Sequence, residues 1–230
     1  MRKKPFLILI CYFLFTSYFG VCLANDEFFQ RGLKYYQEGD FQIAIAHLEE
    51  AKKTVPREAL IYFYLGNSYY EIKDLDNAIL NFTTGLNFTD KKGVYFYNLG
   101  NCYFLKGNYD FAAEMYSKAS QNDPTLYDSY LNAGNAFYKK GDIPKTIVQW
   151  ETYLRVYPET PQYVKIEKAI AYLKGELVAA TDSQTAQPEL EEELLSEVLS
   201  DLEELISRTE NVMETSEAPI DDLRSEEIER

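Results

Sequence analysis

Apolar side chains recur at helical spacing from residue 25 to about residue 175, with polar residues between them. The pattern predicts helices arranged in pairs. Gly39, Gly107 and Gly141, each followed by Asp or Asn, supply a left-handed C′ residue and a cap for the next helix. The second pair has Lys73-Asp74 there and keeps only the cap. First helices are expected at about 25–38, 59–72, 93–106 and 127–140, and second helices at about 41–53, 75–87, 109–121 and 143–156.

A strict period underlies these pairs. Four glycines stand 34 residues apart: Gly32, Gly66, Gly100 and Gly134. Four residues before each glycine is an aromatic residue: Phe28, Tyr62, Phe96 and Tyr130. Sixteen residues after each glycine is a large side chain: Leu48, Phe82, Tyr116 and Trp150. A fixed period of this length marks stacked structural repeats, and glycine opposite a large side chain lets two helices approach closely.

This pattern closely resembles that of the tetratricopeptide repeat. The resemblance covers about two thirds of the chain and implies an all-α fold, a right-handed α-solenoid of helix pairs. The four repeats are placed at 25–58, 59–92, 93–126 and 127–160.

A capping helix and a tail follow the repeats. Residues 161–175 predict a helix with one face on the stack and the other in water, which suits Lys165, Glu167, Lys168 and Lys174. Residues 176–188 read as a polar linker and residues 189–230 as an acidic tail. Leucines at helical spacing predict an amphipathic helix at about 189–207, and composition indicates disorder from Thr209 onward. The helix could pack on the repeats, bind a partner or stay solvated.

Charge is distributed unevenly along the chain. The net charge of the whole chain is −14. Residues 25–175 carry a net −2, whereas residues 189–230 carry 3 basic and 16 acidic residues. Neither part has the basic surface that nucleic-acid binding requires, so nucleic acid is not expected as a partner.

Residues 1–24 are interpreted as a signal peptide. Arg2, Lys3 and Lys4 precede an apolar run, and Cys22-Leu23-Ala24 is suited to cleavage before Asn25. Two alternatives remain: an uncleaved membrane anchor, because residues 6–24 hold 19 uncharged residues, or a lipidated Cys22. Cleavage would leave Cys102 as the one cysteine of the mature chain, most simply a buried apolar residue.

No motif indicates catalysis. The one histidine, His47, has no cysteine or acidic pair at ligand spacing, and no phosphate-binding loop or nucleophile elbow is present. We therefore expect neither enzymatic activity nor a cofactor or metal site.

The resemblance implies a concave groove lined by the first helix of each pair. It assigns to that groove a row of asparagines flanked by aromatic residues: Phe29, Asn67, Tyr70, Tyr97, Asn101, Phe104, Asn135 and Tyr138. Amides both donate and accept, so such a row could hold a peptide backbone. The alternative is that the aromatics pack between repeats. Some arrays of this family clamp the acidic carboxyl terminus of chaperones with lysine and arginine side chains. Those positive charges are missing here, since the fourth repeat has Asp128 and Asn132 at two of the positions, so an acidic chaperone tail is not expected as the ligand.

These features predict an exported scaffold for protein–protein interaction in the bacterial cell envelope, most simply the periplasm, with a peptide segment as its ligand. The alternative is a structural or assembly factor whose acidic tail helix mediates self-association. The small exported array with an acidic tail is loosely similar to the repeat-containing member of the aerotolerance (Bat) operons. A solute-binding or enzymatic aromatic pocket is a third, remote interpretation.

Overall fold

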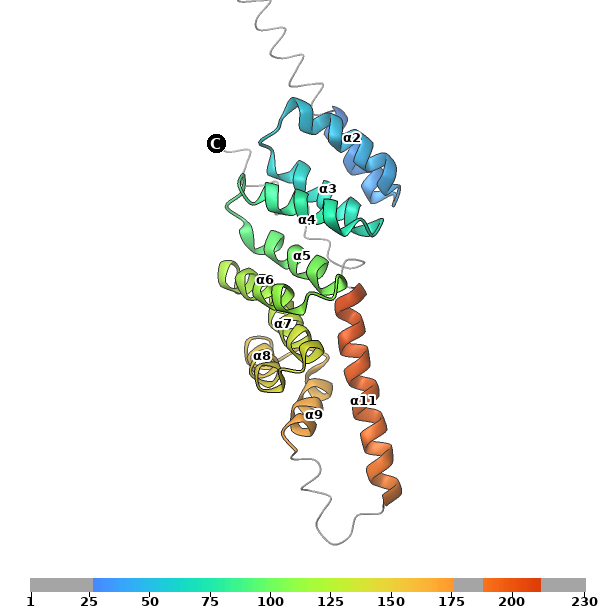
Figure 1. The fold of residues 1–230 in the computed structure, drawn as a ribbon, viewed down its shortest axis with the longest axis vertical. Coiled ribbons are helices and arrows are strands. Elements are labelled where there is room, and N and C mark those ends of the chain that lie inside the picture. Colours follow the sequence, from blue (N-terminus) through green and yellow to red (C-terminus); the bar gives the residue numbers. More distant parts are fainter. Residues whose placement is uncertain (1–26, 176–187, 212–230) are drawn as a thin grey trace, which may run out of the picture. The chain divides into compact units, whose positions relative to one another are not determined.

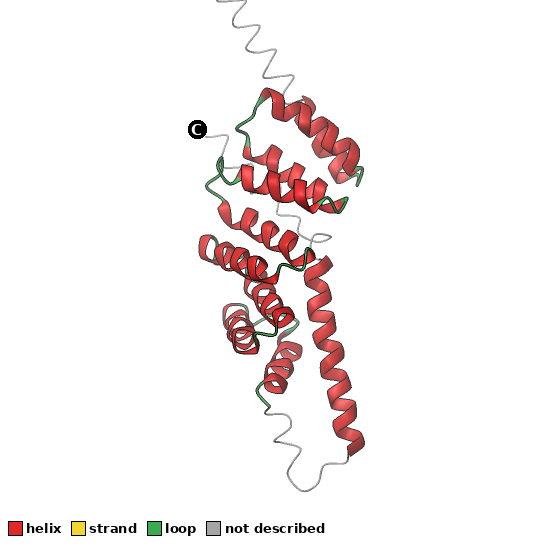
Figure 2. Cartoon of the chain, in the orientation of Figure 1, coloured by secondary structure: helices red, strands yellow, loops and turns green. Residues whose placement is uncertain are grey.

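The computed structural model describes residues 27–175 and 188–211, with some side chains of the last segment left undescribed. The described residues form helices joined by loops, without strands (Figure 2). The chain divides into two compact units, residues 1–89 and 90–230. The division falls next to Asp90, where the second repeat lacks the proline that ends the other three.

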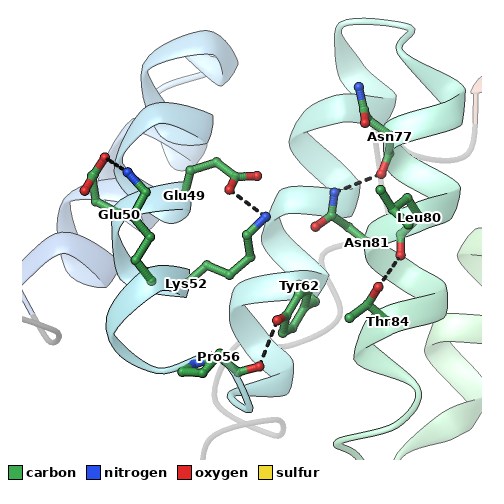
Figure 3. Close-up of polar contacts among 10 residues, drawn as sticks. Glu49, Glu50, Lys52, Pro56, Tyr62, Asn77, Leu80, Asn81 and Thr84 are labelled. Carbon is green, nitrogen blue, oxygen red and sulfur yellow. Dashed lines mark hydrogen bonds and ion pairs between the residues drawn. The ribbon is translucent and has the colours of Figure 1, made fainter.

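The first unit contains two helix pairs. A helix over residues 27–37 precedes α2 (Phe41–Thr54), and α3 (Ala59–Glu71) precedes α4 (Leu75–Gly85). Helix α3 packs against both α2 and α4. The Tyr62 hydroxyl of α3 donates a hydrogen bond of 2.8 Å to the Pro56 carbonyl, which ties α3 to the turn after α2 (Figure 3). The repeat proline therefore has a partner in the aromatic four residues before the glycine.

The second unit contains two further pairs and two additional helices. The pairs are α5 (Lys92–Leu105) with α6 (Tyr109–Asn122) and α7 (Asp128–Lys140) with α8 (Ile143–Val156). Helix α9 (Tyr163–Leu173) packs against α8. Helix α11 (Pro188–Asn211) returns along the unit and packs against α9, α7 and α5 (Figure 1). The expected all-α helix-pair fold is confirmed, and the tail helix lies against the repeats of its own chain.

Each repeat glycine faces the large side chain sixteen residues later. A Cβ atom placed on Gly66 would lie 2.5 Å from a ring carbon of Phe82, and one on Gly100 would lie 2.5 Å from a ring carbon of Tyr116. Gly32 meets Leu48 and Gly134 meets Trp150 in the same way. All four large side chains have no exposed surface. Helices within a pair thus approach at a distance that only glycine permits.

The turns between paired helices use left-handed backbone. Gly39, Gly107 and Gly141 adopt φ values of 81°, 73° and 83°. Lys73 adopts φ 63° at the same place in the second repeat, so this turn keeps its geometry without glycine. Asp74 caps α4 through the Asn77 amide, as the sequence predicts.

Candidate functional site: the face that holds the tail helix

Helix α11 buries an apolar stripe against the second unit. Val198, Leu202 and Leu205 are each 1 % exposed. They join an apolar cluster to which α7, α8 and α9 contribute Leu131, Trp150, Tyr153, Leu154, Ile166, Ala169 and Ile170. Ile206 joins a second cluster with Tyr97 and Phe104 of α5. We call the sides of α5, α7 and α9 that contact α11 the tail-binding face.

Buried amides fix the carboxyl-terminal part of α11. The Asn135 side chain amide donates to the Leu205 carbonyl at 3.0 Å and to the Thr209 hydroxyl at 2.7 Å. Thr209 in turn donates to Asn132 Oδ1 at 2.9 Å, and Asn132 donates to the Tyr97 hydroxyl at 3.0 Å. A hydroxyl suits this position because it accepts from one amide and donates to the other.

In the second unit, the asparagine that directly follows each repeat glycine is oriented by the large residue of its own repeat. Asn135 Oδ1 accepts from the Trp150 indole N–H at 2.9 Å, and Asn101 Oδ1 accepts from the Tyr116 hydroxyl at 2.8 Å. Because each oxygen is occupied, each amide nitrogen is left to donate elsewhere. Asn135 donates to α11, whereas Asn101 Nδ2 is buried and has no hydrogen-bond partner among the described residues.

Ion pairs border the apolar stripe. Lys165 Nζ of α9 lies 3.0 Å from an Asp201 carboxylate oxygen and 2.6 Å from one of Glu204, and Lys168 Nζ lies 2.8 Å from one of Glu197. Hydrogen bonds to Glu204 and Asp201, followed by their charge, raise the pKa of Lys165. Glu197 raises the pKa of Lys168 in the same way. The lysine side chains are each 37 % exposed, so solvent screens the ion pairs. The pairs therefore add little stability and act mainly by favouring acidic residues at these positions of the bound helix.

The structure buries most of the residues assigned to the groove. Asn67, Tyr70, Tyr97, Asn101, Phe104 and Asn135 are buried, and Phe29 and Tyr138 are partly buried. Phe29, Asn67 and Tyr70 belong to the first unit, and the other five to the second. In the first unit, the Phe29 ring lies 6.0 Å from that of Tyr64. In the second unit, Asn135 bonds α11, while Tyr97, Phe104 and Tyr138 pack in the clusters that hold Ile206 and Leu205.

One expectation is incomplete and a second needs correction. Lys165 and Lys168 are expected on the water-facing side of the capping helix and are partly exposed, but acidic residues of α11 also lie against them. Thr209 was assigned to a disordered segment, but it lies within α11 and is 1 % exposed. The signal for Thr209 was present in the spacing, because it continues the series Val198, Leu202, Leu205 with a further step of four. Residues 212–230 lie outside the described residues.

The remaining candidate groups have packing roles. His47 stacks on Tyr35 with ring centroids 5.3 Å apart. Cys102 is fully buried, and burial raises the pKa of its thiol, which keeps it protonated and unreactive. No cluster of metal-ligating side chains occurs among the described residues. Within the same residues, no helix combines the length and the apolar character needed to cross a membrane.

Comparisons with known proteins agree with this architecture. Family models described as tetratricopeptide repeat match residues 29–82 and 94–126. The chain therefore contains tetratricopeptide repeats, which imply a scaffold for protein–protein interaction. No curated protein matches the chain in sequence.

Solved structures with the same fold are distant in sequence. The crystal structure of MamA is 18 % identical, with a TM-score of 0.61 over 82 % of this chain and 94 % of that chain. PilF of Pseudomonas aeruginosa is 19 % identical, with a TM-score of 0.59 over 91 % of this chain and 96 % of that chain. At such identities the similarity shows the fold alone. The predicted signal peptide lies in residues outside the described part.

Proposed function

We propose that this protein is an exported scaffold of the bacterial cell envelope whose tail-binding face takes a peptide segment of another protein. The second unit provides a surface with apolar, amide and cationic contacts in fixed positions. Export rests on the signal-like residues 1–24.

One observation carries the proposal: the tail-binding face already holds a helical segment. Helix α11 is joined to the repeats by residues outside the described part, and it makes the contacts that a separate peptide would make. It buries four apolar side chains and bonds one backbone carbonyl and one hydroxyl. A surface that accepts a tethered helix in this way is suited to a free one of the same chemistry, since tethering changes effective concentration and not the contacts.

Photocrosslinking in intact cells tests the proposal. A photoreactive phenylalanine in place of Tyr138 lies at the tail-binding face, and the same residue in place of Phe111, which is 49 % exposed on α6, is the matched control. We expect position 138 to give an adduct with a discrete second protein, strengthened when Leu202→Asp displaces α11. Adducts to the chain itself alone, in both backgrounds, would refute the proposal.

The export part is tested separately. Amino-terminal sequencing of the protein from fractionated cells should give a chain that begins at Asn25 in the envelope fraction. An intact Met1 in a membrane fraction would indicate an anchor, and lipid on Cys22 would indicate lipidation. An intact chain in the soluble interior of the cell would contradict export.

The packing of α11 also favours a second candidate function, that of an assembly factor joined through its tail. The same contacts could form between two copies if α11 of one chain occupied the tail-binding face of another. Light scattering across a hundredfold range of protein concentration distinguishes the cases, because exchange of α11 between copies makes the mass depend on concentration. The aerotolerance-operon role belongs to this second candidate.

A further inference from the structure

The chemistry of the tail-binding face specifies its ligand more narrowly than the proposed function requires. Cations stand beside the apolar stripe at Lys165 and Lys168, and both meet carboxylates. Each acidic residue lies next to a buried apolar residue in the sequence of α11: Glu197 before Val198, Asp201 before Leu202 and Glu204 before Leu205. A helix with basic residues at those three places would bring like charges together.

The hydroxyl position adds a second requirement. Asn132 presents an oxygen and Asn135 a nitrogen to Thr209, which is 1 % exposed. An aliphatic side chain there would leave the Asn132 oxygen without its donor and would remove one of the two acceptors of the Asn135 nitrogen. A carboxylate would place its oxygens against the Asn132 oxygen. Among uncharged side chains of this size, a hydroxyl satisfies both amides at once.

Asn101 shows that the face offers more than α11 uses. Ile206 of α11 packs with Tyr97 and Phe104, which lie one turn before Asn101 and about one turn after it on α5. Asn101 Nδ2 is nonetheless a buried donor without a partner in the described part of the chain, although its oxygen accepts a hydrogen bond as that of Asn135 does. Helix α11 thus bonds the donor of the fourth repeat and does not bond the equivalent donor of the third.

We propose that the ligand of the tail-binding face is an acidic amphipathic helix of a partner protein that carries a serine or threonine on its apolar face, and that α11 occupies this place in the free protein. This inference rests on the proposed function and names its ligand class. The ligand places apolar residues at the positions of Val198, Leu202 and Leu205, each preceded by an acidic residue, and a hydroxyl four residues after the last of them. It displaces α11, whose own fit leaves Asn101 unsatisfied.

Peptide binding to the full chain tests the inference. The probe is a fluorescein-labelled peptide with the sequence of residues 188–211, followed by fluorescence anisotropy. The receptor is the mature chain with Leu202→Asp, which places a charge in the apolar cluster and releases α11. Leu199→Asp is the matched control, since the same change falls on an exposed side chain of the same helix. Circular dichroism confirms that both chains are folded.

We expect the Leu202→Asp chain to bind the peptide at least about a hundredfold more tightly than the control, whose tethered α11 competes at millimolar effective concentration. Reversing the charges at Glu197, Asp201 and Glu204 in the peptide should weaken binding roughly tenfold at low salt and less at high salt. Replacing Thr209 with valine in the peptide should weaken binding roughly tenfold, because the Asn132 and Asn135 side chains each lose one buried hydrogen bond.

The failures are distinguishable. Equal binding of all three peptides to the released chain would overturn the ligand class and leave the proposed function standing. No binding of any peptide to a folded released chain would overturn the proposed function as well. A mass that doubles with concentration for the wild-type chain would make a second copy, not a partner protein, the occupant.

Hydrogen exchange on the wild-type chain tests whether α11 can leave. We expect amides of α11 to exchange at least about a hundredfold faster than those of α7, through opening that leaves the repeats folded. If α11 exchanged only when α7 did, it would be a permanent part of the unit and the inference would be wrong.

Discussion

Replacing the asparagine that directly follows the repeat glycine should change the stability of the protein in opposite directions in the third and fourth repeats. In the third repeat, the double variant Asn101→Leu/Tyr116→Phe removes a buried amide whose nitrogen is unpaired, together with the hydroxyl bonded to its oxygen. In the fourth repeat, Asn135→Leu removes an amide whose oxygen and nitrogen are both bonded. The residue type and repeat position are the same, and the hydrogen-bonding state differs.

The magnitudes follow from the bonds in each case. A buried unpaired donor costs about 1–3 kcal/mol, and the lost hydroxyl–amide bond contributes about 1 kcal/mol, so the double variant should gain about 1 kcal/mol. Asn135→Leu breaks three hydrogen bonds, leaves the Trp150 indole N–H without its acceptor and removes a donor from the Leu205 carbonyl and from the Thr209 hydroxyl, so it should lose about 2–4 kcal/mol. Tyr116→Phe alone leaves Asn101 wholly unsatisfied and should lose about 1–2 kcal/mol.

Trp150 provides the assay, because it is the one tryptophan of the chain and lies in the cluster that holds α11. Urea unfolding followed by its fluorescence reports on the second unit without requiring that both units unfold together. We expect the midpoint to rise for the double variant and to fall for Asn135→Leu. A fall of similar size in both would show that Asn101 Nδ2 has a partner in solution, and the argument from the unpaired donor would fail.

Three further outcomes are expected. Lys73→Gly should stabilise the first unit by about 0.5–1 kcal/mol, measured by thermal unfolding, because Lys73 holds a left-handed φ that costs glycine little; no gain would show that the strain is absent. Gly134→Ala should destabilise the second unit by about 1–3 kcal/mol, since its Cβ would meet the Trp150 ring, and an unchanged urea midpoint would contradict the close approach. Raised pKa values of Lys165 and Lys168 mean that their contribution to α11 docking is complete below the unfolded pKa of about 10.4 and is lost as pH rises through the higher folded pKa. At low salt, the protection of α11 amides, taken relative to the intrinsic exchange rate at each pH, should therefore fall at high pH in the wild type and stay constant in Lys165→Met/Lys168→Met.

The helix pairs could be read from the chain because local rules determine them. Gly100 and Tyr116 stand at a fixed spacing, and the structure places them in contact as that spacing predicts. The left-handed backbone at Lys73 is not predicted from the sequence, since a residue with a Cβ atom disfavours it. Helix boundaries agree to within a few residues, except that α11 extends to Asn211.

The site was harder to predict because its decisive contacts are distant in sequence. Asn135 and Thr209 are 74 residues apart, and no periodicity links the tail to the repeats. The resemblance assigns Asn101 and Asn135 to an open groove as amides flanked by aromatic residues, whereas both side chains are buried. The sequence does not predict that both asparagines are buried. Nor does it predict that their oxygens accept hydrogen bonds from Tyr116 and Trp150.

In two repeats the asparagine accepts a hydrogen bond from a ring fifteen residues later. This pairing limits the number of asparagine donors that the repeats can hold in a fixed orientation. Tyr116 and Trp150 each carry a polar hydrogen that turns the amide so that its nitrogen faces away from the pair. Phe82 stands at the corresponding place for Asn67 and has no such hydrogen. The ring, and not the asparagine, therefore determines the orientation of the amide. Tyr116→Phe would remove the polar hydrogen from the third repeat, so the orientation of the Asn101 amide in the second unit could be changed without changing the asparagine itself.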